Sequence, residues 1–163
     1  MLSALYRHHA PALFRFALRL TGDRAAAEDL VADTFVVAVA GGGPAEPASA
    51  RAFLFGTVRN LALHGRRSAA RRPRAPFEVV DSLAGPSDPE RDAAARADLA
   101  ATIADLQALS EEVRTALLLR TEGLAYQEIA EVLGISEGAA KVRVHRARVA
   151  LATRRSTREG EAP

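Results

Sequence analysis

The stretch from Gly123 to Arg155 constrains the fold more than any other part of this sequence, because it joins a short amphipathic segment, a glycine and a long basic segment. Gly134 predicts a tight turn, since glycine reaches backbone angles that other residues adopt only with strain. Ser136 is a natural N-cap, so we expect one helix from about Tyr126 to Leu133 and a second beginning after Ser136. A short helix, a glycine turn and a second helix form the helix-turn-helix pattern.

The second helix of this pattern has two different faces. Its predicted buried stripe has the spacing i, i+4, i+7, i+11 and consists of Ala140, Val144, Ala147 and Leu151. The opposite side carries Gly138, Val142, His145, Arg146 and Val149, flanked by Lys141 and Arg143. One-sided positive charge and small residues suit a helix in a DNA major groove, and an exposed valine can lie against a thymine methyl group. The alternative interpretation is a helical hairpin with a solvated basic face.

Composition limits the functional classes. The chain has 163 residues, 48% of them hydrophobic, which is enough for folded cores, and its sequence pI of about 9.6 reflects an excess of arginine. It has no cysteine, which excludes disulfides and thiolate metal sites. No apolar run approaches the roughly 20 residues that cross a bilayer, and there is no signal peptide, so we expect a cytoplasmic protein without stable membrane insertion. No phosphate-binding loop, metal-ligand pair or nucleophile motif is present, so we expect no catalytic site, cofactor or metal.

The N-terminal part is predicted to be helical throughout. One helical region covers residues 1–22, in which Pro11 is expected to begin a second run. A second helix capped by Asp23 runs to Ala40, and a third capped by Ser49 runs to Arg72. The second helix carries an acidic patch, which either keeps the surface soluble or awaits a basic partner, and spacing does not decide between the two. This patch consists of Glu28, Asp29 and Asp33.

Aromatic and basic residues alternate along the third helix. The aromatic and basic residues are Phe53, Phe55, Arg59, Arg66 and Arg67, and the polar Asn60 lies beside Arg59. Rings on which bases stack, together with cations for the backbone, are what single-stranded nucleic acid requires. Core packing of Phe53 and Phe55 is the equally weighted alternative.

Proline and acidic residues separate this region from the rest of the chain. We therefore expect an all-α protein of two small helical domains. The first domain is residues 1–72, followed by a flexible linker at 73–97, a second domain with the helix-turn-helix at 98–155 and a polar tail at 156–163. Helices in the second domain are expected to begin at Asp98 and after Ser110.

Three segments, taken together, resemble the bacterial RNA polymerase sigma factors of the sigma-70 family, and specifically the small extracytoplasmic-function group that keeps only domains two and four. They are LYRHHAPALFRFALRLTGDRAAAEDLVADTF at 5–35, ARAFLFGTVRNLALHGRR at 50–67 and LSEEVRTALLLRTEGLAYQEIAEVLGISEGAAKVRVHRAR at 109–148. Their order and spacing are those of the family, and together they cover most of the chain.

The resemblance implies a function and its partners: a subunit that binds core RNA polymerase, at the largest-subunit clamp and the beta flap, and directs promoter-specific initiation. Binding of the clamp would involve Glu28, Asp29, Asp33 and Phe35. Recognition of minus-ten DNA would involve Phe53, Phe55, Arg59, Asn60, Arg66 and Arg67. Recognition of minus-thirty-five DNA would involve Lys141, Val142, Arg143, His145 and Arg146. An anti-sigma factor is a further possible partner. Where the family often has serine in the recognition helix, this chain has Val142.

Two other functions compete with this interpretation. A stand-alone helix-turn-helix regulator would share the C-terminal unit, but it would carry an α/β receiver or ligand domain in front, and residues 1–72 show no strand alternation. A helical interaction protein would not need the basic second helix.

Overall fold

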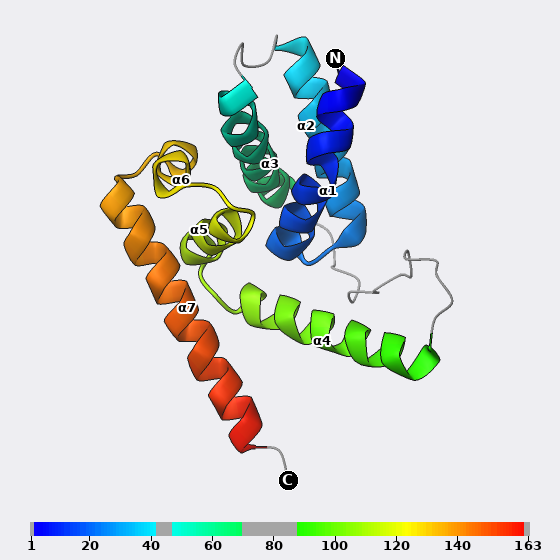
Figure 1. The fold of residues 1–163 in the computed structure, drawn as a ribbon, viewed down its shortest axis with the longest axis vertical. Coiled ribbons are helices and arrows are strands. Elements are labelled where there is room, and N and C mark those ends of the chain that lie inside the picture. The colour runs from blue at the N-terminus through cyan, green and yellow to red at the C-terminus, as the bar shows by residue number, and fades with distance from the viewer. Residues whose placement is uncertain (1, 42–46, 70–87, 162–163) are drawn as a thin grey trace.

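A computed structural model describes residues 2–41, 47–69 and 88–161, and its regular structure there is entirely helical. The helices are α1 (Leu2–Thr21), α2 (Arg24–Ala40), α3 (Pro47–Ala69), α4 (Pro89–Gln107), α5 (Glu111–Thr121), α6 (Tyr126–Leu133) and α7 (Glu137–Gly160). Helices α1 to α3 form an N-terminal unit, and α4 to α7 form a C-terminal unit in which α4 and α7 diverge from α5 (Figure 1). The all-α prediction is confirmed. The predicted linker at 73–97 lies largely outside the described residues.

Helix α1 is continuous through Pro11, so the prediction that a new helical run begins there is wrong. A proline inside a helix removes one backbone hydrogen bond and costs roughly 3 kcal/mol. Residues on both sides of Pro11 pack into one core, Leu5 before it and Leu13 and Phe16 after it. This packing offsets the cost of the proline.

The boundary between α1 and α2 follows the predicted chemistry. Gly22 ends α1 with φ of +69°, and the Asp23 carboxylate accepts a hydrogen bond from the backbone N–H of Ala26 at 3.1 Å. The predicted cap is therefore confirmed, and it satisfies one of the amide groups that a helix start leaves without an intrahelical partner.

Two helices begin earlier than predicted. Helix α3 starts at Pro47, so Ser49 lies inside its first turns rather than at its cap. Helix α4 starts at Pro89 instead of Asp98, because the Asp88 side chain accepts a hydrogen bond from the N–H of Glu90 at 3.1 Å. Proline suits the first turn of a helix, where its missing N–H costs nothing, and acids there complement the helix dipole. The Asp-Pro-Glu sequence was therefore a helix start and not part of a linker.

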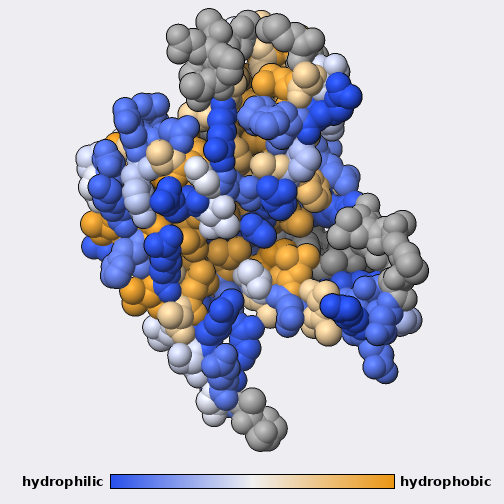
Figure 2. Space-filling view, in the orientation of Figure 1, coloured by the Kyte–Doolittle hydropathy of each residue, from blue (hydrophilic) through white to orange (hydrophobic). Residues whose placement is uncertain are grey.

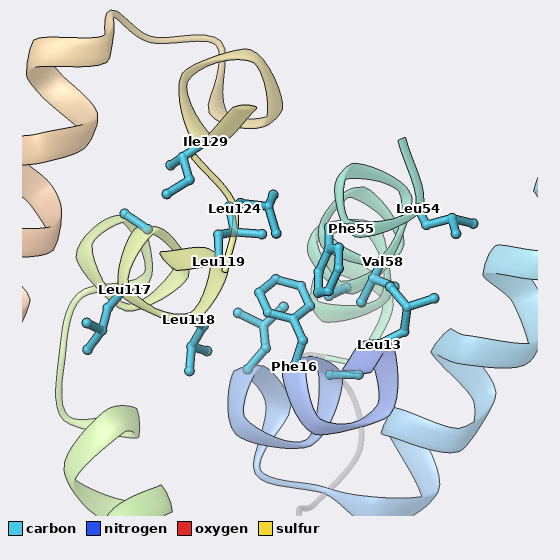
Figure 3. Packing of buried hydrophobic residues seen from close by; sticks show 14 of the residues in the cluster. Leu13, Phe16, Leu54, Phe55, Val58, Leu117, Leu118, Leu119, Leu124 and Ile129 are labelled. Carbon is cyan, nitrogen blue, oxygen red and sulfur yellow. The ribbon is translucent and has the colours of Figure 1, made fainter. Parts of the chain in front are cut away.

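The two units share one hydrophobic core. Phe16 of α1 and Phe55 of α3 are fully buried, with ring centroids 5.2 Å apart and planes at 75°. Figure 3 shows them on the side of α1 and α3 that faces Leu119 and Leu124 of the C-terminal unit. At the ends of the chain, α7 continues to Gly160, so most of the predicted polar tail is helical.

Candidate nucleic-acid interface

The predicted helix-turn-helix is present as α6, a three-residue turn and α7. Gly134 has φ of 64° and ψ of 39°, the left-handed conformation expected for it, and the Ile135 N–H bonds back to the Ala130 carbonyl at 3.0 Å. The Ser136 hydroxyl accepts a hydrogen bond from the Ala139 N–H at 3.1 Å and caps α7. The backbone and caps therefore fix the direction in which α7 leaves the turn.

Helix α7 turns one face to the core and the opposite face to solvent. Ala140, Val144 and Ala147 are fully buried against the rest of the C-terminal unit, and Leu151 is half-buried, so the predicted stripe is confirmed. On the opposite face the exposed fractions of Val142 and Val149 are 47% and 51%. These two valines are seven residues apart, so they lie on one line along the helix, about 10 Å apart.

Charged and polar side chains flank this apolar line. His145 and Arg146 are exposed, whereas Lys141 and Arg143 already bond within the protein. The Lys141 ammonium lies 3.1 Å from Glu137, and Arg143 lies 3.3 Å from Glu112 of α5. The structure thus places all five residues predicted for minus-thirty-five DNA on one helix, but it directs Arg143 partly toward α5.

The residues predicted for minus-ten DNA have different environments on α3. Asn60 is exposed and accepts a hydrogen bond from Arg59 at 3.4 Å. Phe53 is half-buried, but Phe55 is fully buried against Phe16. In this arrangement the Phe55 ring is not available to a base, and it packs as the alternative interpretation expected. The side chains of Arg66 and Arg67 lie outside the described part of α3.

The acidic patch lies on the solvent face of α2. Glu28, Asp29 and Asp33 are exposed, and Glu28 also pairs with Arg24 at 3.1 Å. Phe35, which the resemblance assigned to polymerase binding, is instead buried beneath Tyr6, with ring centroids 4.7 Å apart. Any contribution of Phe35 to binding is therefore indirect.

Exposed apolar residues near the acidic residues were missed by the sequence reasoning. They are Val36, Val37 and Val39 of α2 and Tyr6 of α1, of which Val37 and Val39 point about 200° apart and lie on different faces of α2. The signal was available, because Phe35 and Ala38 already complete the buried stripe of α2, so the valines between and after them cannot all face the core. Val36 and Val39, three residues apart, do lie on one face, and neighbouring exposed apolar residues of this kind mark interaction surfaces.

Among the described residues, no group of histidine and acidic side chains is placed to hold a metal ion, and none of the described helices is both long and apolar enough to cross a membrane. In Figure 2 charged and polar residues cover most of the visible surface, and apolar residues collect near the junction of the two units.

Comparison with known families accounts for both units. Residues 5–72 match the family model for sigma-70 region 2, and residues 105–151 match the model for sigma-70 region 4. The chain is also 39% identical over 154 residues to the ECF RNA polymerase sigma factor SigL of Mycobacterium tuberculosis, covering 89% of this chain and 83% of SigL. The chain belongs to the extracytoplasmic-function sigma factors of the sigma-70 family.

Solved structures of sigma factors share the fold of this one. The sigma factor RpoE of Bartonella quintana, solved in complex with the anti-sigma factor NepR, matches with a TM-score of 0.68 and 30% identity, over 90% of this chain and 91% of RpoE. CnrH, solved in complex with the cytosolic domain of CnrY, matches with a TM-score of 0.68 and 26% identity, over 99% of this chain and 89% of CnrH. As an extracytoplasmic-function sigma factor, the protein directs transcription initiation.

Proposed function

We propose that this sigma factor binds core RNA polymerase through α2 and reads its promoters with two separate surfaces. The α7 face around Val142, His145 and Arg146 enters the major groove of minus-thirty-five DNA, and the exposed part of α3 around Asn60 contacts the minus-ten element. The observation that carries this proposal is the two-sided α7, buried along Ala140 and Ala147 and open on the opposite side. The protein acts in the cytoplasm as an initiation subunit without catalytic activity of its own.

The polymerase-binding surface combines charge and apolar area. The exposed acids Asp29 and Asp33 would meet basic residues of the largest-subunit clamp, and the neighbouring Tyr6 and Val36 supply apolar area. Charge complementarity of this kind mainly sets orientation and association rate, whereas burial of the apolar residues supplies affinity. The C-terminal unit would contact the beta flap.

An anti-sigma factor is proposed as a third partner. This rests on the complex of the similar RpoE with the anti-sigma factor NepR. A stand-alone regulator is not favoured, since the chain carries region 2 as well as region 4.

Transcription with purified core polymerase and a genomic promoter library tests the proposal. We expect specific initiation that depends on this protein. The double variant Asp29→Arg with Asp33→Arg should lose binding to core polymerase and retain binding of duplex DNA. The variant Arg146→Ala should show the opposite behaviour, and Asp98→Arg, an exposed charge reversal on α4, should match the wild type. Absence of specific initiation from every template would contradict the proposal.

A further inference from the structure

Helix α7 is attached to the other helices of the C-terminal unit along one of its two edges. Three of its arginines pair with acids of α4 and α5, and all three lie on that edge: Arg143, Arg154 and Arg158. We propose that Glu112 of α5 is a positioning residue for DNA recognition, which holds Arg143 and so fixes the rotation of α7 about its own axis. The proposal rests on the proposed function and deepens it, because that rotation decides which side chains of α7 reach the bases.

The anchored edge begins at Arg143, which the resemblance assigned to minus-thirty-five DNA. Its guanidinium lies 3.3 Å from the Glu112 carboxylate, and its side chain is 23% exposed, whereas that of Glu112 is 74% exposed. Arg143 follows Val142 by one residue, so the two side chains point about 100° apart. While the pair persists, the Arg143 guanidinium is directed toward α5 and away from the line of Val142 and Val149.

Asp105 of α4 continues the anchored edge toward the end of α7. Its carboxylate pairs with Arg154, at 3.3 Å, and with Arg158, and its side chain is only 16% exposed. Arg154 follows Arg143 by eleven residues, which is about three full helical turns, so the two arginines lie on the same edge. Acids from two different helices thus hold α7 at points roughly 16 Å apart along its axis.

The opposite edge of α7 carries Lys141 and Arg148, which are seven residues apart. The Lys141 ammonium pairs with Glu137 of its own helix at 3.1 Å and lies 5.7 Å from the ring centroid of Tyr126. Arg148 is exposed and makes no ion pair with any residue that the structure describes. Both cations can therefore turn toward phosphate groups without breaking an ion pair between helices.

The buried stripe of α7 determines its rotation only weakly. Two of its three fully buried residues are alanines, Ala140 and Ala147, and the third is Val144. Packed helices interlock when the side-chain ridges of one fit into the grooves of the other, and a methyl group forms only a low ridge. The ion pairs of the anchored edge therefore supply a constraint on rotation that the stripe lacks.

A small rotation of α7 is enough to abolish base recognition. Side-chain tips lie about 5–6 Å from the axis of a helix, so a rotation of about 20° displaces them by about 2 Å. Hydrogen bonds to base edges require donor–acceptor distances between about 2.7 and 3.2 Å and do not survive such a shift. Long, flexible cations that contact phosphates adapt to it. Loss of the Glu112 pair should therefore reduce sequence preference and spare the sequence-independent affinity.

Competition between two DNA templates measures the sequence preference. The full-length protein in complex with core polymerase first selects a minus-thirty-five element from a random library, and a scrambled copy of that element is the competitor. We expect Glu112→Gln to lower the ratio of the two affinities about tenfold and to leave the affinity for the scrambled template unchanged. Glu131→Gln is the matched control and should keep the wild-type ratio, because Glu131 is also exposed but makes no ion pair with a described residue.

The salt dependence of binding separates positioning from direct contact with DNA. Each phosphate contact contributes about 0.9 to the slope of log affinity against log salt concentration. Arg148→Ala should lower this slope by about 0.9 and weaken binding to both templates equally. Arg143→Ala should leave the slope unchanged and lower the preference about tenfold, as Glu112→Gln does. A slope lowered by about 0.9 in Arg143→Ala would mean that Arg143 contacts a phosphate itself, and the positioning role would be wrong.

Two rescue variants test whether Glu112 acts through Arg143. Glu112→Arg and Arg143→Glu should each lower the preference, and their combination should restore it, because the pair forms again with its charges exchanged. Arg143→Lys should keep most of the preference, since a lysine can still pair with Glu112, whereas a base bonded by both ends of the Arg143 fork would be lost. A combination that fails to restore the preference overturns the proposal. A loss in Arg143→Lys as large as that in Arg143→Ala does the same.

Unfolding of the isolated protein tests the pair without DNA. In urea denaturation followed by circular dichroism, which also shows that each variant is folded, the effects of Glu112→Gln and Arg143→Ala on the unfolding equilibrium constant should be non-additive by about two- to fivefold. Additive effects would show that the pair does not form. If the pair is coupled but the wild-type complex selects no element, the proposed function fails. If the wild type selects an element and Glu112→Gln keeps the preference, the positioning role fails and the function stands.

Discussion

Phe53 and Phe55 are two residues apart on α3 and have different surroundings, one half-buried and the other fully buried. Residues at this spacing point about 200° apart on a helix, so they cannot share one face. The buried positions Leu54, Phe55 and Val58 identify the core side of α3. Composition predicted that both rings could stack on bases. Helical periodicity shows that Phe53 lies toward the surface, where stacking is open to it, and that Phe55 lies in the core.

Val142 offers a direct test of base recognition. If its side chain contacts a thymine methyl group, replacing that thymine with uracil should weaken binding of a minus-thirty-five duplex by about 1 kcal/mol, or roughly fivefold. In the Val142→Ala variant the same uracil substitution should have little effect. Fluorescence anisotropy with single-uracil duplexes measures both. The variant Val149→Ala, about two turns further along α7, serves as a comparison, and it should keep the uracil response that depends on Val142.

His9 makes stability depend on pH. Burial lowers the pKa of His9, and the nearby charges of His8 and Arg51 lower it further. Because the folded-state pKa lies below the unfolded value of about 6.5, the unfolded chain binds the proton more readily, and the free energy of unfolding falls as pH drops below about 6.5. Urea denaturation between pH 7 and 5 should show this loss. It should be smaller in His9→Gln.

The helix boundaries show which features can be predicted from residues that are close together in the sequence. The caps at Asp23 and Ser136 and the turn at Gly134 were predicted correctly, since each depends on residues within one turn of the chain. Helix α4 was predicted too short because Pro89 was assigned to the linker at 73–97, whereas Asp88 caps a helix that begins at Pro89. Pro11 was misinterpreted for a different reason: tertiary packing on both sides of it outweighs the local cost.

Two serines provide a matched test of helix capping. Ser110 and Ser136 both precede helices, but only Ser136 makes a side-chain hydrogen bond to its helix. Ser136→Ala should lower the free energy of unfolding by about 1 kcal/mol, whereas Ser110→Ala should change it by a few tenths. Thermal unfolding followed by circular dichroism distinguishes them. Equal losses in the two variants would show that the bond at Ser136 contributes nothing.

The contacts between the two units could not be predicted from the sequence. Glu122 and Arg15 are 107 residues apart, and Gln107 and Arg19 are 88 apart. Periodicity identifies which face of a helix is buried but not what buries it. The polar groups in these contacts also have no distinguishing pattern, because arginine and glutamate are common on any solvated helix face.

Phe55 connects the stability of the molecule to this junction. Truncation in Phe55→Ala removes a fully buried ring and should cost about 3–5 kcal/mol in the free energy of unfolding. Phe53→Ala, at a half-buried position, should cost markedly less. Urea denaturation of the full-length chain measures both. A small effect at Phe55 would show that its ring is not enclosed in solution.

The burial of Phe16 and Phe55 in the core shared with the C-terminal unit also has a consequence during synthesis. Helices α1 to α3 leave the ribosome first, and Leu124 follows Phe55 by 69 residues (124 minus 55). At a synthesis rate of about 5–20 residues per second, the two rings stay uncovered for on the order of 10 s before Leu124 is made. The nascent N-terminal half therefore exposes apolar surface during that interval. We expect chaperones that bind exposed apolar segments to associate with it.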